Sequence, residues 1–242
     1  GTVTENQLEQ ETLAWLADVG YTHLYGPDIA FDGPTPERAN YRQVLLTFRL
    51  REAVGKLNPT IPTAAREDAL KQVLDLGIPA LLSANRHFHR LLVGGVPVQY
   101  QLNGETRGDF VRLVAWANPQ RNEWLAVNQF SIKGSHHTRR PDIVLFVNGL
   151  PLVLIELKNP ANEQTDVWDA LNQLQTYKDE ISDLFNSNAA LVVSDGWTAR
   201  VGSLTANAER MLPWRTIANE DDRPRLQLEL ETVVRGFFAP EL

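Results

Sequence analysis

The chain has 242 residues, of which 43% are hydrophobic and 22% charged, the balance of a globular protein with one large α/β domain or two small ones. It has no cysteine, which excludes disulfides and thiolate chemistry, and its net charge of −7 argues against a nonspecific nucleic-acid coat. No apolar run approaches the roughly 20 residues that span a bilayer, and no basic segment followed by an apolar one opens the chain. We therefore expect a cytoplasmic protein.

The first third of the chain predicts helices. Thr4 and Gln7 form the pattern of a capping box, and they begin an amphipathic helix over 4–19 that carries Glu11. A Gly- and Pro-rich connection follows over 20–36. Further helices are expected over 37–56, with Phe48 facing inward, over 63–76 and over 79–91.

Strands dominate the middle of the chain. We expect them over 99–102, 110–116, 125–132, 143–147 and 152–155, with turn-rich segments between them. A helix over 163–177 then leads to strands over 189–194 and 199–203, and a last helix over 225–238. The sequence has no GxxxxGK[ST] motif, so we expect no ATP-binding P-loop in this piece.

The segment RPDIVLFVNGLPLVLIELKNP, residues 140–160, predicts a buried β-hairpin with charged residues at one end. Asn148-Gly149 joins two nearly continuous apolar runs, which is typical of a β-hairpin whose strands are covered on both faces. Counting outward from this turn brings Asp142 almost opposite Glu156, and Lys158 shares a strand face with Glu156. Two carboxylates and a lysine therefore converge at one end of a buried hairpin.

Buried charges are costly unless they pair or bind a metal, so this convergence predicts one of two arrangements. Glu156 and Lys158 can form a strand-end ion pair, with Asp142 as a turn residue. Alternatively, the two carboxylates hold Mg²⁺ through oxygen ligands, with the Leu157 carbonyl as a further ligand, and Lys158 orients or activates a water.

The most basic short segment, KGSHHTRR, comes directly before the hairpin. It contains Lys133, His136, Arg139 and Arg140, which can contact a DNA backbone at the edge of a metal site. An ordinary polar loop is the alternative.

These motifs resemble those of a known family. Pro141-Asp142 and Glu156-Leu157-Lys158, fourteen positions apart at the two acids, resemble the PD-(D/E)XK nuclease motif. Gln173 and Tyr177, within QLQTY, look like the QxxxY motif that accompanies it in type I restriction enzymes. With the flanking segments QETLAWL and SDGWTARVGS, nearly the whole chain resembles the N-terminal endonuclease region of the restriction (R) subunit of these enzymes.

The resemblance implies a restriction-endonuclease-like fold, a central mixed β-sheet flanked by helices with an N-terminal helical portion. It implies a helical part over 1–95, a nuclease core over 96–220 and a helix over 221–242 that leads toward an ATP-driven motor not present here. Asp142, Glu156 and Lys158 would be catalytic, with Gln173, Tyr177 and Glu11 in support.

The implied function is Mg²⁺-dependent hydrolysis of double-stranded DNA, with methylase and specificity subunits as partners. ATP would serve only the missing motor. Two alternatives stay open: a stand-alone repair-type nuclease with the same core, and a catalytically silent, nuclease-like assembly module.

Overall fold

The computed structural model describes residues 4–159, 167–195, 199–204 and 212–213. Its centre is a seven-stranded mixed sheet in the order β1-β4-β7-β8-β9-β10-β11, with β1 parallel to β4, β8 parallel to β9 and the other neighbours antiparallel. The strands of this sheet are β1 (Thr22–Tyr25), β4 (Trp124–Asn128), β7 (Ile143–Val147), β8 (Leu150–Leu157), β9 (Ala190–Ser194), β10 (Ala199–Gly202) and β11 (Leu212–Pro213). The expectation of a central mixed sheet is confirmed.

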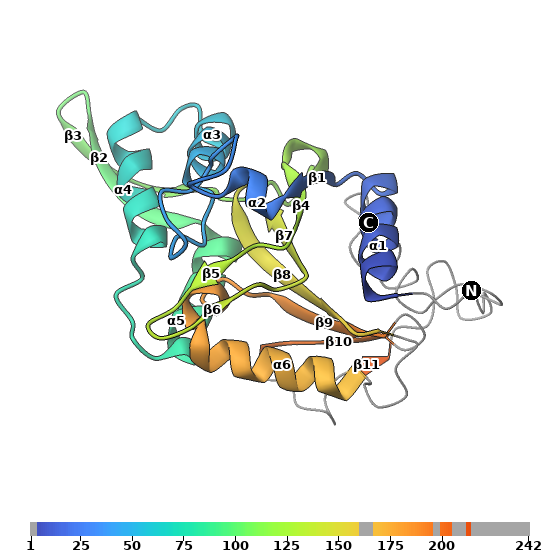
Figure 1. The fold of residues 1–242 in the computed structure, drawn as a ribbon. Helices are drawn as coiled ribbons and strands as arrows, with labels where there is room; N and C mark the ends of the chain where they lie inside the picture. The colour runs from blue at the N-terminus through green and yellow to red at the C-terminus, as the bar shows by residue number, and fades with distance from the viewer. Residues whose placement is uncertain (1–3, 160–166, 196–198, 205–211, 214–242) are drawn as a thin grey trace.

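Helices cover both faces of this sheet (Figure 1). Residues from α1 (Glu5–Asp18), α3 (Thr47–Leu57), α4 (Thr63–Leu74) and α5 (Leu81–Gly94) pack on one face, and α6 (Val167–Glu180) packs on the other. Along β7, Ile143, Leu145 and Val147 join the first core, whereas Val144 and Phe146 join the second. Both strands of the hairpin are fully buried, which explains why their sequences are apolar without alternation.

The remaining elements are short or lie outside the main sheet. They are α2 (Gly26–Ile29), the 3₁₀ helices η1 (Pro119–Arg121) and η2 (Ser182–Phe185), a two-stranded ribbon of β2 (Val96–Leu102) and β3 (Glu105–Val111), and a second small pair, β5 (Ile132–Lys133) with β6 (Thr138–Arg139). The β2–β3 ribbon projects away from the body of the molecule (Figure 1).

Two predictions for the helix expected over 37–56 are wrong: where it begins and which way Phe48 faces. The helix expected from residue 37 begins only at Thr47, because the preceding loop wraps around the buried guanidinium of Arg38. That group donates to the carbonyls of Gln43, Ser131 and Tyr41 at 2.9, 2.6 and 3.0 Å. These carbonyls can converge on one guanidinium only if the loop curves around it, whereas the carbonyls of a helix point along the helix axis. Phe48, expected to face inward, is 67% exposed.

The early strands also differ from expectation. The connection expected to be irregular over 20–36 contains β1, which pairs with β4 in the central sheet. The segment taken as a turn before residue 110 is mostly β3, and the true turn is Asn103-Gly104, where both residues have positive φ. β2 and β3 pair only with each other rather than with the central sheet.

Helix α1 is confirmed, including the capping box of Thr4 and Gln7. None of the described helices is long and apolar enough to cross a membrane. The helix expected over 225–238 and the proposed division at residue 221 lie outside the described residues.

Candidate active site

The predicted hairpin is present, and a β-bulge within it brings the two carboxylates together. Asn148 and Gly149 occupy its two-residue turn with φ of 53° and 81°. Near the turn Phe146 faces Pro151, but beyond an irregularity Leu145 faces Val153, and Ile143 faces Ile155. Continuing this register sets Asp142 opposite Glu156.

The extra residue is Leu152, and it decides which face Glu156 occupies. Leu152 and Val153 both pack into the same core although they are adjacent in sequence, as expected where a bulge interrupts the alternation of side chains. Without this extra residue Asp142 would face Ile155, and Glu156 would point to the opposite face of the sheet. With it, both carboxylates lie on the face that α6 covers.

A chain of hydrogen bonds links these carboxylates to α6. The Leu157 peptide N–H donates to Asp142 Oδ2 at 2.7 Å, and the Asp142 N–H donates to Glu156 Oε2 at 3.3 Å. The Tyr177 hydroxyl donates to Glu156 Oε1 at 3.4 Å, and Gln173 Nε2 donates to the Tyr177 oxygen at 3.0 Å. The structure thus brings together the QxxxY residues and both acids.

Burial makes the two acids reluctant to ionise. Asp142 is 8% exposed and Glu156 4%. Loss of hydration raises the pKa of Asp142 to about 7, with Glu5 and Glu9 adding to the effect. Burial, and then the charge of Asp142, hold the pKa of Glu156 well above its usual range. Ionising both acids would therefore require a nearby positive charge to offset their negative charges.

The positive charge of Lys158 offsets the negative charges of Asp142 and Glu156 only in part. Lys158 is half-buried, and its peptide N–H donates to the Ser194 carbonyl at 2.8 Å. Its charge lowers the pKa of both acids, although less than burial raises it. Among described residues, the ion pairs do not include Glu156 with Lys158, so the strand-end ion pair considered above is not formed.

The donor set fits a hard divalent cation. Adjacent carboxylates and a neighbouring peptide carbonyl, here that of Leu157, are the oxygen ligands that Mg²⁺ prefers. A cation would offset the cost of burying both charges and the repulsion from Asp142 that further raises the pKa of Glu156. No group of three or more His, Asp or Glu side chains suited to a metal occurs in the described part of the chain. The remaining ligands would therefore be waters and a phosphate, as is usual for Mg²⁺.

The buried acid of α1 beside this pair is Glu9 rather than Glu11, and Glu5 of the same helix also lies near Asp142. Glu11 is exposed, whereas Glu9 is 6% exposed and accepts from Asn128 Nδ2 and Gln129 Nε2, both at 2.8 Å. Gln129 has a positive φ of 55°, and its N–H donates to the Asp142 carbonyl at 3.0 Å. Glu9 therefore ties α1 to the backbone that carries Asp142. The helical periodicity could have identified it, because Glu9 precedes Leu13 by four positions and Leu16 by seven.

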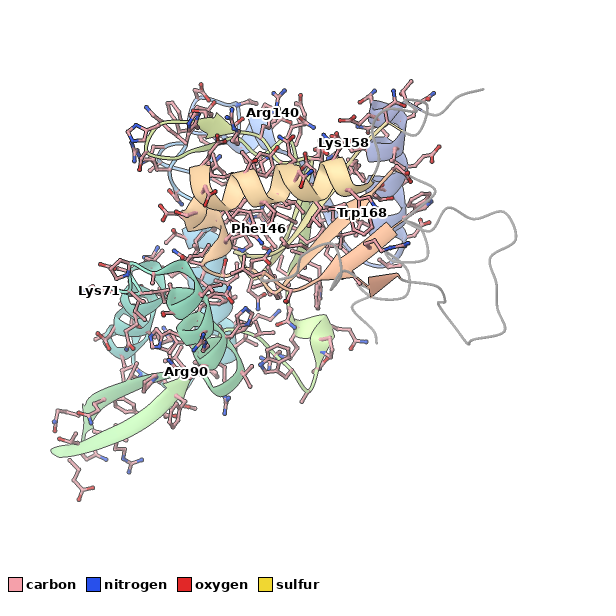
Figure 2. All side chains as sticks on the ribbon, turned by 90° about the horizontal axis from the view of Figure 1, so that it is seen from below. Lys71, Arg90, Arg140, Phe146, Lys158 and Trp168 are labelled. Atoms are coloured by element: carbon pink, nitrogen blue, oxygen red, sulfur yellow. The ribbon has the colours of Figure 1, made fainter. Side chains whose placement is uncertain are left out.

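The basic segment has divided roles. Arg139 makes a two-pronged ion pair with Glu180 at the end of α6, and His137 lies 3.7 Å from the same carboxylate. Arg140 belongs to the wall of the cleft described below, and Figure 2 shows both it and Lys158 beside α6. Lys133 and His136 are exposed and are not part of that wall.

A cleft of about 930 Å³ opens onto Asp142. Its walls come from α1, the ends of β1 and β4, β6 with the Arg140 that follows it, and α6. Asp142, Gln173 and Tyr177 reach its surface, whereas Glu156 is covered. A molecule bound in this cleft would contact Asp142, and Asp142 would lie between that molecule and Glu156.

Comparison with known proteins identifies the family of this chain. Residues 2–210 match the family model described as "Type I restriction enzyme R protein N terminus". The chain belongs to this family.

Its relatives are much longer proteins. The chain is 41% identical over 242 residues to the type I restriction enzyme HindI endonuclease subunit of Haemophilus influenzae, covering 99% of this chain and 23% of that protein. It is 31% identical over 221 residues to the putative MjaIXP endonuclease subunit of Methanocaldococcus jannaschii, covering 89% of this chain and 21% of that protein. The chain thus corresponds to the N-terminal region of type I restriction enzyme endonuclease subunits and spans less than a quarter of their length.

Proposed function

We propose that this chain is the DNA-cleaving region of a type I restriction enzyme R subunit, with a PD-(D/E)XK nuclease centre that hydrolyses phosphodiester bonds with the help of Mg²⁺. The observation that carries the proposal is the pair of buried, adjacent carboxylates: Asp142, which lines a polar cleft, and Glu156, which lies directly behind it. Burying two such negative charges destabilises a fold unless a cation or a proton neutralises them.

Asp142, Glu156 and the Leu157 carbonyl would hold the cation, which would supply Lewis-acid polarisation of the scissile phosphodiester. The Leu157 N–H and the Tyr177 hydroxyl each already bind one carboxylate oxygen, which fixes the orientation of both acids before substrate arrives. Such preorientation avoids reorganisation during the reaction.

Lys158 is proposed to orient the attacking water or to offset charge that develops on the phosphate oxygens. It follows Glu156 by two positions, and its charge lowers the pKa of both acids, which supports a role at the same centre. Because it is not committed to an ion pair with Glu156, its ammonium can serve the substrate. Arg140 is the best-placed phosphate contact of the basic segment, since Arg139 is engaged by Glu180.

In the complete protein we propose that cleavage acts on double-stranded DNA, together with methylase and specificity subunits and an ATP-driven motor outside this chain. The relatives' names as endonuclease subunits of type I enzymes support this context over a stand-alone repair nuclease.

The test is plasmid nicking in Mg²⁺ by the chain, and DNA cleavage by the complete R subunit that contains it, assembled with its partners. Asp142→Asn and Lys158→Ala should each abolish cleavage, and Lys158→Ala should leave metal binding intact. Lys71→Ala is the matched control, because Lys71 is exposed on α4 and lies far from Lys158 (Figure 2).

Cleavage by the assembled Asp142→Asn enzyme at the wild-type rate would refute the nuclease centre. Absence of cleavage by the assembled wild-type enzyme would instead favour the silent assembly module.

A further inference from the structure

The walls of the cleft are poor in available positive charge. Among the described residues that line it, Glu5, Glu9 and Asp142 are acidic, and the cations are Arg139 and Arg140. Arg139 is already paired with Glu180. Most of the other lining side chains are neutral amides: Asn6, Gln10, Asn128, Gln129 and Gln173. This composition does not match the dense phosphate charge of a duplex, about one negative charge per 1.7 Å of helix axis.

An exposed aromatic side chain stands in the same wall. Tyr25 ends β1, where it pairs with Asn128 of β4, so both residues are held at the edge of the cleft by the sheet. Its side chain is 44% exposed. Neither its ring nor its hydroxyl contacts another described residue through a hydrogen bond or a ring pair.

Building on the proposed nuclease function, we propose that Tyr25 stacks on an unpaired nucleobase, and that the cleft therefore admits one locally single-stranded segment of DNA rather than an intact duplex. Three features agree. An exposed ring face is the platform on which proteins stack the bases of single strands. Side-chain amides can bond the Watson–Crick edge only when that edge is free. A single strand also carries half the phosphate charge per unit length of a duplex, which better suits a wall whose one guanidinium outside an ion pair, among the described lining residues, is that of Arg140.

Binding can be measured without relying on metal or catalysis. Asp142→Asn removes one negative charge from the cleft and prevents turnover, so it serves as the parent protein for fluorescence anisotropy with a labelled 12-nucleotide single strand and the matching duplex. We expect the single strand to bind more tightly than the duplex. In this parent, Tyr25→Ala should weaken single-strand binding about 5- to 150-fold, the range for loss of one stacked base, and leave duplex binding unchanged.

Conservative variants separate stacking from folding. Tyr25→Phe keeps the ring and should bind as the parent does, whereas Tyr25→Leu keeps apolar bulk without a π face and should behave like Tyr25→Ala. Phe31→Ala is the matched control, because Phe31 is 46% exposed and does not line the cleft. A 2-aminopurine base in the strand should lose fluorescence on binding the parent and much less on binding Tyr25→Leu.

Equal single-strand binding by the parent, Tyr25→Ala and Tyr25→Leu would overturn the proposal, as would tighter binding of the duplex than of the single strand. Either result would leave the nuclease assignment standing, because that rests on metal binding and cleavage. If the Asp142→Asn enzyme still cleaved DNA at the wild-type rate while single-strand binding still depended on Tyr25, only the nuclease assignment would be overturned.

Discussion

Replacing Asp142 by asparagine should stabilise the metal-free protein at pH 8. The carboxyl is 8% exposed, and burial raises its pKa to about 7 from an ordinary 3.8. A pKa difference of about 3 corresponds to about 4 kcal/mol, the most that ionising this group can cost the fold. Because the neighbouring Glu156 is buried with Asp142 and repelled by its charge, part of this cost belongs to the pair, and we expect a gain of about 2–4 kcal/mol. Asparagine keeps an oxygen that can accept from the Leu157 N–H, so the hydrogen bond is retained.

The stabilisation by Asp142→Asn should depend on pH. A carboxyl whose pKa is raised by folding contributes stability that is fully present below its unfolded pKa and is lost as pH rises through its folded pKa. The metal-free wild type should therefore lose stability between about pH 4 and pH 8 through this group, and Asp142→Asn should lose less over the same interval. At pH 4 the two proteins should be nearly equal.

Urea unfolding in EDTA at pH 4, 6 and 8, followed by circular dichroism, measures this difference. Asp68→Asn, an exposed aspartate on α4, is the matched control and should change the unfolding free energy little at any pH. In saturating Mg²⁺ the order at pH 8 should reverse, because only the wild type gains binding energy. Destabilisation of the metal-free protein at pH 8 by Asp142→Asn would show that the carboxylate is structural and would refute the reasoning.

Three further predictions follow from the same geometry. Mg²⁺ affinity should rise between pH 6 and pH 8, because Asp142 and Glu156 must lose protons that their raised pKa values retain; calorimetric titration that finds no rise would contradict this. Tyr177→Phe removes the hydroxyl bonded to Glu156 and should weaken Mg²⁺ binding about 10-fold, measured in the same way, with unchanged binding as the contrary result. Glu9→Gln leaves one of the two amides that Glu9 binds without an acceptor and should lower the unfolding free energy by about 1–3 kcal/mol. Glu11→Gln, on the exposed face of the same helix, should change that free energy by less than about 0.5 kcal/mol. Equal effects of the two substitutions in urea unfolding would count against the assignment of Glu9.

The hairpin shows how far local sequence determines this fold. Asn148-Gly149 and the two apolar runs predict both strands, their turn and their burial, because turn geometry and β propensity act over a few residues. The sequence also places Asp142 almost opposite Glu156. It does not reveal the bulge at Leu152, which depends on packing into a core formed by distant helices.

The missed features depend on long-range contacts. The loop before α3 curves around Arg38, which also binds the carbonyl of Ser131, 93 residues away, and no local pattern indicates that contact. β1 exists because β4 offers it an edge about a hundred residues later. Glu9 could have been chosen over Glu11 from helical periodicity, whereas Tyr25 gains its position only through that pairing with β4.

The most direct test of the central claim is a calorimetric titration of Mg²⁺ into the wild-type chain and Glu156→Gln at pH 8, with and without DNA. Glutamine keeps the size of the side chain and its capacity to accept from the Tyr177 hydroxyl, but it removes the charge. The account predicts binding by the wild type that is lost in Glu156→Gln. Equal binding by both proteins, or no binding by the wild type even with DNA present, would contradict a metal centre at Asp142 and Glu156.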